Sequence, residues 1–282
     1  MIIVTGTKRS GTSMWMQILN AAQLPVLGSA FPKNWGESIR EANQEGFYES
    51  PLRGGIYYAT NPHPKTGLYL FPEDTRRAAV KVFVPGLIRS DIAFIDRVIA
   101  TMRNVREYGP SISRLYAMEH EHKLSRTLEK GGDPSNVPTI EYVPPELEWW
   151  SDNFSLLSDA LTRRYPLHMV SYDAVMQRPE ELIPEAIDWL GGGDAQAAVA
   201  VVKHELRTQG EQTREHYVPA LDADILDLCD ELYRRVHVRE PLTGELIDAL
   251  NAADERLHPQ IKQARRRAHQ SRLAARRRLR AQ

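Results

Sequence analysis

The chain has one cysteine, Cys229, among its 282 residues. A single cysteine excludes an internal disulfide and a cysteine-based zinc site. Long hydrophobic runs are also missing, since no apolar stretch reaches the roughly 18 residues of a membrane-spanning helix. A strand predicted from residue 2 leaves no room for a signal peptide. We therefore expect a cytoplasmic protein.

Acidic residues are missing from the last part of the chain. Residues 256–282 carry ten lysines and arginines and no Asp or Glu, so subtracting +10 from the net charge of −1 leaves residues 1–255 at −11. This basic segment could bind nucleic acid or another anionic surface, or form a helix that packs on the acidic body. No aromatic residues alternate with the arginines to stack on bases, which favours the packed helix.

The overall composition is that of an ordinary globular protein, with 42% hydrophobic and 26% charged residues. Short apolar runs alternate with helical patterns, which predicts an α/β fold with a central, mostly parallel sheet and helices on both faces. We expect an α/β domain over residues 1–250 and a basic helical extension over residues 251–282. Oligomeric state has no signature in the sequence.

The first 22 residues combine a strand, a glycine-containing loop and a helix. Ile2–Val4 is a short β-branched run typical of a buried parallel strand. A polar, basic loop follows between Gly6 and Gly11, and we expect Thr12 or Ser13 to cap the next helix. Backbone N–H groups of such a loop and the positive end of the helix dipole bind anions. The segment predicts a site for a phosphate-type group.

The spacing of this loop fits the Walker A pattern of nucleotide-binding proteins except at one position. Thr12 stands where the lysine that reaches the β- and γ-phosphates belongs. The positive charge lies earlier, at Lys8 and Arg9. An unusual kinase or nucleotide hydrolase without the Walker lysine remains one alternative, and a non-catalytic anion- or nucleic-acid-binding protein is another.

Residues 9–13 (Arg-Ser-Gly-Thr-Ser) resemble the 5′-phosphosulfate loop of sulfotransferases that use 3′-phosphoadenosine 5′-phosphosulfate (PAPS). The resemblance implies a P-loop-like fold and a cofactor site that includes Lys8, Arg9, Ser10, Gly11, Thr12 and Ser13. It also implies that Arg9 stabilises the charge that develops on the leaving phosphate. The product would be 3′-phosphoadenosine 5′-phosphate (PAP), and with fixed cations in place we expect no metal.

A second signature begins at Arg103. The segment Arg103–Ser111 resembles the Arg-Asn-Pro-x-Asp…Ser motif of the same family, in which the arginine and a serine eight residues later hold the 3′-phosphate. Val105 and Glu107 replace the proline and the aspartate of that motif. A guanidinium at the end of a strand and a hydroxyl at the start of a helix can converge on one phosphate. Two signatures in the family's order strengthen the interpretation.

The strand predicted over Ala79–Pro85 resembles the family's Lys-Thr-His-x-Pro strand, with Lys81 in register. Phe83 stands where the catalytic histidine is expected, and phenylalanine cannot accept a proton. We therefore look elsewhere for the general base. Glu49, in a Gly-Phe-Tyr-Glu stretch that resembles bacterial sulfotransferase-like sequences, is the first candidate, and His63 is the second.

Later segments extend the resemblance to about residue 190. A predicted strand at 95–102, with 97–102 as its apolar part, another at 167–170, a helix at 154–165 and a Tyr-Asp…Pro…Leu-Gly segment from Tyr172 follow the family's order. Arg207 and Arg214 are candidates for a late cofactor-binding loop. Taken together, the resemblance implies transfer of a sulfuryl group from PAPS to a hydroxyl or amine of a small-molecule or carbohydrate acceptor, whose identity the sequence does not give.

Overall fold

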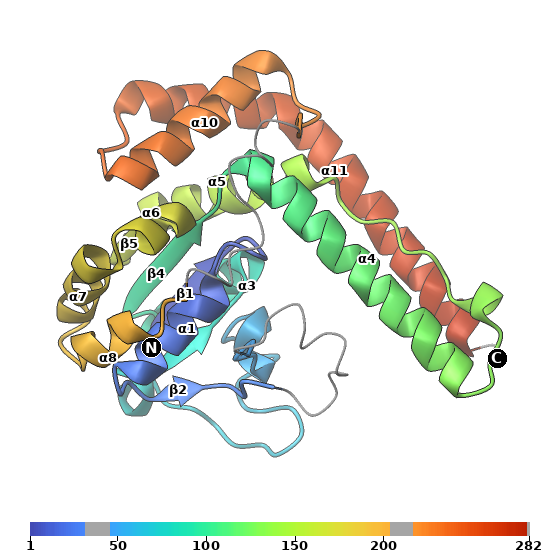
Figure 1. Ribbon diagram of the computed structural model, residues 1–282, viewed down its shortest axis with the longest axis horizontal. Coiled ribbons are helices and arrows are strands. Elements are labelled where there is room, and N and C mark those ends of the chain that lie inside the picture. Colours follow the sequence, from blue (N-terminus) through green and yellow to red (C-terminus); the bar gives the residue numbers. More distant parts are fainter. Residues whose placement is uncertain (32–45, 204–216, 281–282) are drawn as a thin grey trace.

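The computed structural model describes residues 1–31, 46–203 and 217–280. Its centre is a five-stranded parallel sheet in the order β2-β3-β1-β4-β5, which confirms the predicted fold class (Figure 1). The carboxyl ends of parallel strands meet at one edge, where α/β proteins bind their ligands. The strands are β1 (Ile2–Gly6), β2 (Val26–Leu27), β3 (Ala79–Lys81), β4 (Arg97–Met102) and β5 (Leu167–Ser171).

Alternation of side chains along β1 divides the core into two layers. Ile2 and Val4 face one side and pack with α1, α7 and α8, whereas Met1 and Ile3 face the other side and pack with α3 and α5. The helices are α1 (Thr12–Ala21), α3 (Val84–Arg89), α4 (Val105–Glu129), α5 (Pro145–Arg163), α6 (Tyr172–Gln177), α7 (Pro179–Trp189), α8 (Ala195–Ala200), α10 (Ala223–Val238) and α11 (Gly244–Arg280).

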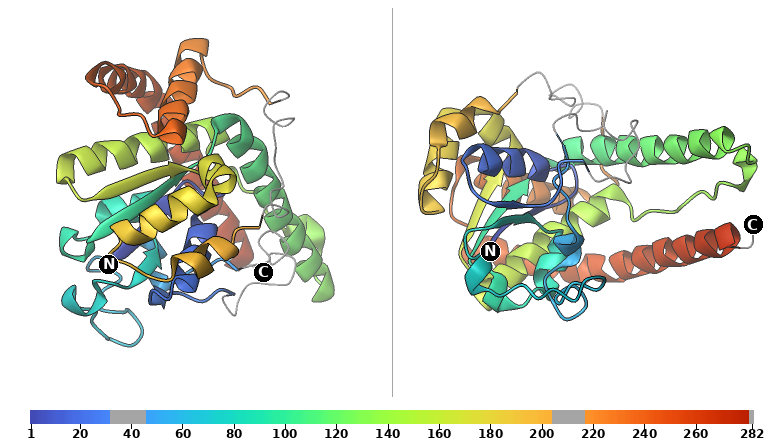
Figure 2. Two further views of the ribbon diagram at one scale, coloured as in Figure 1. Left: turned by 60° about the vertical axis from the view of Figure 1, so that its left-hand side comes forward. Right: turned by 90° about the horizontal axis from the view of Figure 1, so that it is seen from below.

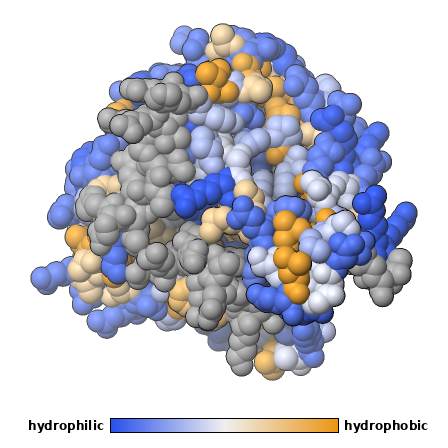
Figure 3. All heavy atoms as spheres, turned by 45° about the vertical axis from the view of Figure 1, so that its right-hand side comes forward, coloured by the Kyte–Doolittle hydropathy of each residue, from blue (hydrophilic) through white to orange (hydrophobic). Residues whose placement is uncertain are grey.

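A third apolar cluster joins α4, α5, α10 and α11. The distal parts of α4 and α11 project together from the body, with the segment that follows α4 running between them (Figure 2). Glu141 in that segment bonds to Ser271 through its backbone N–H and pairs with Arg267. The basic helix thus packs on the chain, as expected, while most of its arginines remain exposed. On the face of the molecule drawn in Figure 3, most of the surface coloured by hydropathy is hydrophilic, and hydrophobic residues occur in small groups.

The structure corrects several predicted boundaries. The second predicted strand ends at Lys81, because Pro85 lies in the first turn of α3, a position that suits proline's fixed φ. The helix predicted from residue 154 begins at Pro145 and already includes Trp149 and Trp150, both fully buried. The short edge strand β2 was not predicted, because two residues carry no periodic signal.

Helix α11 runs without a break through residue 250, so the predicted division between 1–250 and 251–282 falls within one helix. Its buried residues include Leu246 and Leu250 before this point and Leu257 and Ile261 after it. The division stays a prediction. Among the described residues, no helix is both long and apolar enough to cross a membrane.

Candidate functional site

The loop between β1 and α1 lies at the carboxyl edge of the sheet, directly beside the end of β4. Gly6 has a φ of 145°, and a Cβ there would lie 2.3 Å from the Thr101 carbonyl oxygen. Only glycine fits so close an approach. The Ser10 hydroxyl donates to the Thr7 carbonyl at 2.7 Å, and the Thr101 hydroxyl donates to the Ser10 carbonyl at 2.6 Å. The loop is therefore fixed from inside and from β4.

The helix after the loop starts differently from the expectation. Gly11, with a φ of 100°, occupies the cap position of α1, and no side chain caps the helix. The prediction that Thr12 or Ser13 provides the cap is wrong. A Cβ on Gly11 would lie 2.7 Å from the Tyr172 ring, so this glycine permits close packing against the residue that follows β5. Without a side-chain cap, backbone N–H groups of the first turn are left for a ligand.

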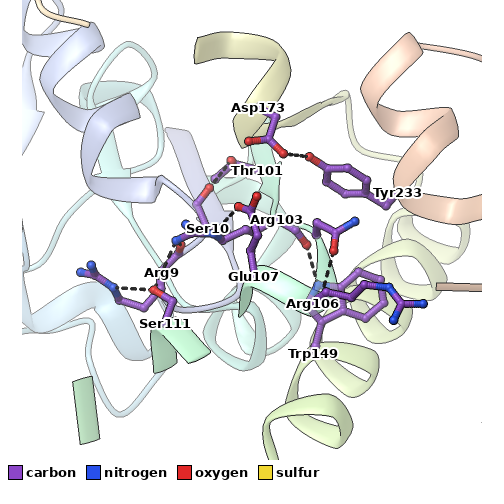
Figure 4. A network of polar contacts seen from close by, with 11 residues as sticks. Arg9, Ser10, Thr101, Arg103, Arg106, Glu107, Ser111, Trp149, Asp173 and Tyr233 are labelled. Carbon is purple, nitrogen blue, oxygen red and sulfur yellow. Dashed lines mark hydrogen bonds and ion pairs between the residues drawn. The ribbon is translucent and has the colours of Figure 1, made fainter. Parts of the chain in front are cut away.

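The two arginines of the two signatures meet at Ser111 (Figure 4). Arg103 Nη1 lies 3.3 Å from Ser111 Oγ and 3.1 Å from the Arg9 carbonyl oxygen, and Arg9 Nε lies 3.5 Å from the same hydroxyl. Arg103 also pairs with the fully buried Glu107 at 3.3 Å, and its guanidinium lies over the Tyr172 ring. The structure thus brings together three predicted cofactor-binding residues.

Ser111 was expected at a helix start, but α4 begins at Val105, so Ser111 lies well inside the helix. Asn104 caps α4 through its side chain, which accepts from the Arg106 backbone N–H at 2.9 Å. Starting the helix there turns Glu107 and Ser111, one turn apart, toward Arg103. The convergence of Arg103 and Ser111 on one point is as expected, although the helix dipole contributes less than supposed.

Two guanidinium groups close together favour an anion between or beside them. Burial, followed by the positive charge of Arg103, lowers the pKa of Arg9. Arg9 also has a φ of 63°, a left-handed conformation that is costly for a residue with a Cβ. Such a cost is common at binding sites, where the surrounding structure imposes it. The arrangement would be stabilised by a bound phosphate.

Lys81 leaves the end of β3 and reaches the first turn of α1. Its ammonium donates to the Phe47 carbonyl at 2.7 Å and to Ser13 Oγ at 3.2 Å, and lies 3.6 Å from Glu49. Glu49 also pairs with Arg53. Burial outweighs the attraction of Glu49 and lowers the pKa of Lys81 to about 8. Lys81 is buried rather than extended into solvent at the edge of the sheet, and it lies beside the loop.

Lys8 points away from the loop. Its ammonium lies 3.0 Å from Glu148 and 3.1 Å from the Tyr116 hydroxyl, on the side of α4 and α5. Burial opposes the charge of Lys8, but Glu148 and Tyr116 together outweigh it and hold its pKa above the ordinary value. Direct binding of the cofactor by Lys8, as predicted, would require this side chain to turn.

Among the described residues, no contact links the remaining sequence-predicted candidates to this cluster. Nδ1 of His63 accepts from the backbone N–H groups of Lys65 and Thr66, which makes it part of its own turn. Phe83 precedes α3 and donates its backbone N–H to Arg53. Arg207 and Arg214 lie outside the described residues.

Sequence reasoning missed several residues of the site. Glu107 and Thr101 hold Arg103 and Ser10 in place, Tyr172 packs under Gly11, and Glu148 binds Lys8. Only Glu107 left a local signal, because it lies four residues after Arg103 within the second signature. The others come from elements that are distant in sequence.

The charged residues of the site suit an anion such as a phosphate. Arg9, Arg103 and Lys81 supply fixed positive charge, and the buried Thr7 hydroxyl has no hydrogen-bond partner in the described part of the chain. A buried hydroxyl of this kind usually serves a ligand or a water molecule. Groups of three or more acidic, histidine or cysteine side chains arranged to hold a metal do not occur among the described residues.

Comparisons with known proteins give the following. No protein-family model matches the chain, and no curated protein matches it. The sulfotransferase domain from the curacin biosynthetic pathway is similar in structure, with 12% identity, a TM-score of 0.39, and coverage of 90% of this chain and 96% of that one. The sulfotransferase domain of the Synechococcus PCC 7002 olefin synthase is similar at 12% identity, with a TM-score of 0.36 and coverage of 89% and 93%. Likenesses this remote carry no argument about function.

Proposed function

We propose that the chain is a sulfotransferase that uses PAPS and transfers its sulfuryl group to a hydroxyl or amine. The observation that carries the proposal is the convergence of Arg9 and Arg103 on the Ser111 hydroxyl, beside a glycine-containing loop. Both guanidinium groups lie within 3.5 Å of that hydroxyl. A nucleotide with two separate phosphate groups, at the 3′ and 5′ positions, needs two anion sites. The Arg103–Ser111 pair and the start of α1 supply them.

When bound, PAPS would supply an activated sulfuryl group on its 5′-phosphate. The backbone N–H groups of residues 11–13 would bind that phosphate, since the N–H of Ser10 already donates to the Thr7 carbonyl at 3.2 Å. Arg103 and Ser111 would hold the 3′-phosphate, which ATP lacks, and so select the nucleotide. Lys81 lies close enough to Ser13 to contact the sulfuryl end, and Arg9 lies near enough to both regions to stabilise charge on the leaving phosphate.

Glu49 is less suited to act as the general base than the sequence indicated. Its carboxylate is 8% exposed and pairs with Lys81 and Arg53, so an acceptor would have to displace one of these partners to reach it. We propose that Glu49 positions Lys81 instead, because it accepts the ammonium at the point where β3 ends.

A thermal-shift titration with PAP, with ADP and with ATP and magnesium tests the donor half of the proposal. A ligand at 100 times its Kd adds about 2.7 kcal/mol to the free energy of unfolding. We expect stabilisation by PAP but not by ADP. Stabilisation by ATP and magnesium alone would indicate a kinase or hydrolase, and no shift with any nucleotide would favour a protein that binds other anions.

A further inference from the structure

A compact polar cluster lies beside the loop, between α4 and α5. The Lys8 ammonium contacts Glu148 Oε1 at 3.0 Å and donates to the Tyr116 hydroxyl at 3.1 Å, while that hydroxyl donates to Glu148 Oε2 at 3.0 Å. The three groups close a triangle around one carboxylate. The Glu148 side chain is 16% exposed and that of Lys8 is 35% exposed, so the triangle is partly desolvated and still reaches the surface.

Two neighbouring residues complete the surroundings of the triangle. Asp152 follows Glu148 by one turn on the same face of α5. Burial of its carboxyl, followed by the negative charge of Glu148, raises the pKa of Asp152 to about 7, although Lys8 and Arg265 oppose the shift. The Tyr142 ring stacks on Tyr116 with ring centres 3.6 Å apart. The cluster therefore combines two carboxyl groups, an ammonium and a pair of aromatic rings.

We infer that Lys8, Tyr116 and Glu148 form the acceptor site of the transferase, and that Glu148 accepts the proton of the acceptor hydroxyl. This inference rests on the proposed function. Two chain connections join the cluster to the proposed donor site, because Lys8 precedes Arg9 in the loop and Tyr116 follows Ser111 by five residues on α4. Glu148 has one ammonium and one neutral hydroxyl as partners, whereas Glu49 has two cations.

The chemistry of the cluster indicates a polar acceptor that carries several hydroxyl groups, such as a sugar. An apolar acceptor would displace water from Lys8, Glu148 and Asp152 and would offer no hydrogen bonds in its place, which is costly. Hydroxyl groups both donate and accept, and can therefore satisfy carboxylates and an ammonium at once. The stacked rings of Tyr116 and Tyr142 offer a flat surface for the C–H face of a sugar ring.

The transfer step balances with residues of this chain. A bond forms between the acceptor oxygen and the sulfur of the phosphosulfate donor, and the bond from sulfur to the 5′-phosphate oxygen breaks. The hydroxyl proton passes to Glu148, and the electron pair leaves with the phosphate, whose charge Arg9 would stabilise. No oxidant, reductant or metal is needed.

Glu148→Gln tests the role of the carboxylate, with the exposed Glu121→Gln on α4 as matched control. The Gln variant keeps the size and the hydrogen bond from Tyr116 but accepts no proton at neutral pH. We expect its transfer rate from PAPS to cellobiose to fall ~100- to 10,000-fold in kcat, with PAP binding and thermal unfolding temperature close to those of the control. An unchanged kcat would overturn the base assignment.

Two binding measurements separate this inference from the proposed function. The donor half fails if the wild-type protein does not bind PAP. If PAP binds, we expect cellobiose to bind the PAP complex in a saturation-transfer NMR experiment, and binding to weaken at least severalfold in Lys8→Met. Absence of cellobiose binding, or faster sulfation of 2-naphthol than of cellobiose and methyl glucoside, would overturn the polar acceptor site while leaving PAP binding intact.

Discussion

One lysine–carboxylate pair lies on each side of β1, and the two pairs differ in how their surroundings shift the pKa of the lysine. Lys81 ends the neighbouring strand β3 and Glu49 lies earlier in the chain; the two side chains are 5% and 8% exposed and lie 3.6 Å apart. Lys8 and Glu148 lie toward β4 and α5, are more exposed, and lie 3.0 Å apart with Tyr116 as a third member. Burial lowers the pKa of Lys81 to about 8, whereas the partners of Lys8 raise its pKa.

The comparison shows that a carboxylate partner alone does not determine the direction in which the pKa of a lysine shifts. Burial disfavours the charged form of both side chains, and the outcome depends on the number and closeness of the partners. Lys81 is therefore suited to contact a bound anion that would complete its charge balance. Lys8 is already satisfied by Glu148 and Tyr116.

Arg9 lies between the two pairs, and its substitution should have the largest effect. We expect Arg9→Asn to lower turnover ~100- to 1,000-fold, because one preorganised donor to the developing charge is lost. Asparagine tolerates the left-handed backbone at this position. Steady-state rates and PAP titrations on the same protein check this. A variant with full turnover would remove Arg9 from the mechanism, as would a loss confined to PAP affinity.

Breaking the more buried pair should cost most in stability. Glu49→Gln leaves the Lys81 ammonium buried beside a neutral amide, and we expect the free energy of unfolding to fall by about 3 kcal/mol at pH 7. Chemical denaturation measures the loss. Because Lys81 can give up its proton, the loss should shrink as the pH rises above 8; a loss that is constant with pH would contradict this account.

Arg103→Ala should act on the nucleotide rather than on turnover. A charged hydrogen-bond partner of the 3′-phosphate is removed, so PAP affinity should weaken by ~1.5–3 kcal/mol while ADP affinity changes little. Isothermal titration with both nucleotides makes the comparison. Equal losses for the two would show that Arg103 supports the loop and not the 3′-phosphate, since it also donates to the Arg9 carbonyl.

The titration of Lys81 predicts how PAPS affinity depends on pH. Lys81 carries its charge below pH 8 and loses it above, so PAPS affinity, measured without an acceptor, should fall up to about tenfold per pH unit beyond pH 8. Lys81→Arg keeps a charge over the same range and should give a flat profile between pH 7 and 9.5. If the wild-type protein and Lys81→Arg give parallel profiles, Lys81 does not contact the nucleotide.

The more exposed pair should contribute least to folding. Lys8→Met removes a side chain that is about one-third exposed, and the expected loss in the free energy of unfolding is below about 1 kcal/mol. Thermal and chemical unfolding of this variant beside Glu49→Gln test the contrast directly. A loss equal to that of Glu49→Gln would show that both pairs hold the fold to the same degree.

Local sequence patterns determined the framework of the site. The β-branched run before Gly6 and the amphipathic helix after Gly11 were predicted, because period and turn residues are local signals. The strand predicted over Ile95–Met102 was also found, although it begins two residues later, at Arg97. The resemblance of residues 103–111 to a 3′-phosphate signature also implied the convergence of Arg103 and Ser111. The fold class followed from the order of these elements.

Tertiary structure decided what each charged side chain does. No local signal places Lys8 against Glu148 or Lys81 against Ser13, because these pairs are separated by 140 and 68 residues. The Gly11 cap likewise depends on the Tyr172 ring, which arrives with β5. Burial and distance between remote segments set the pKa values and the partners of these groups, and neither quantity is encoded in a short stretch of sequence.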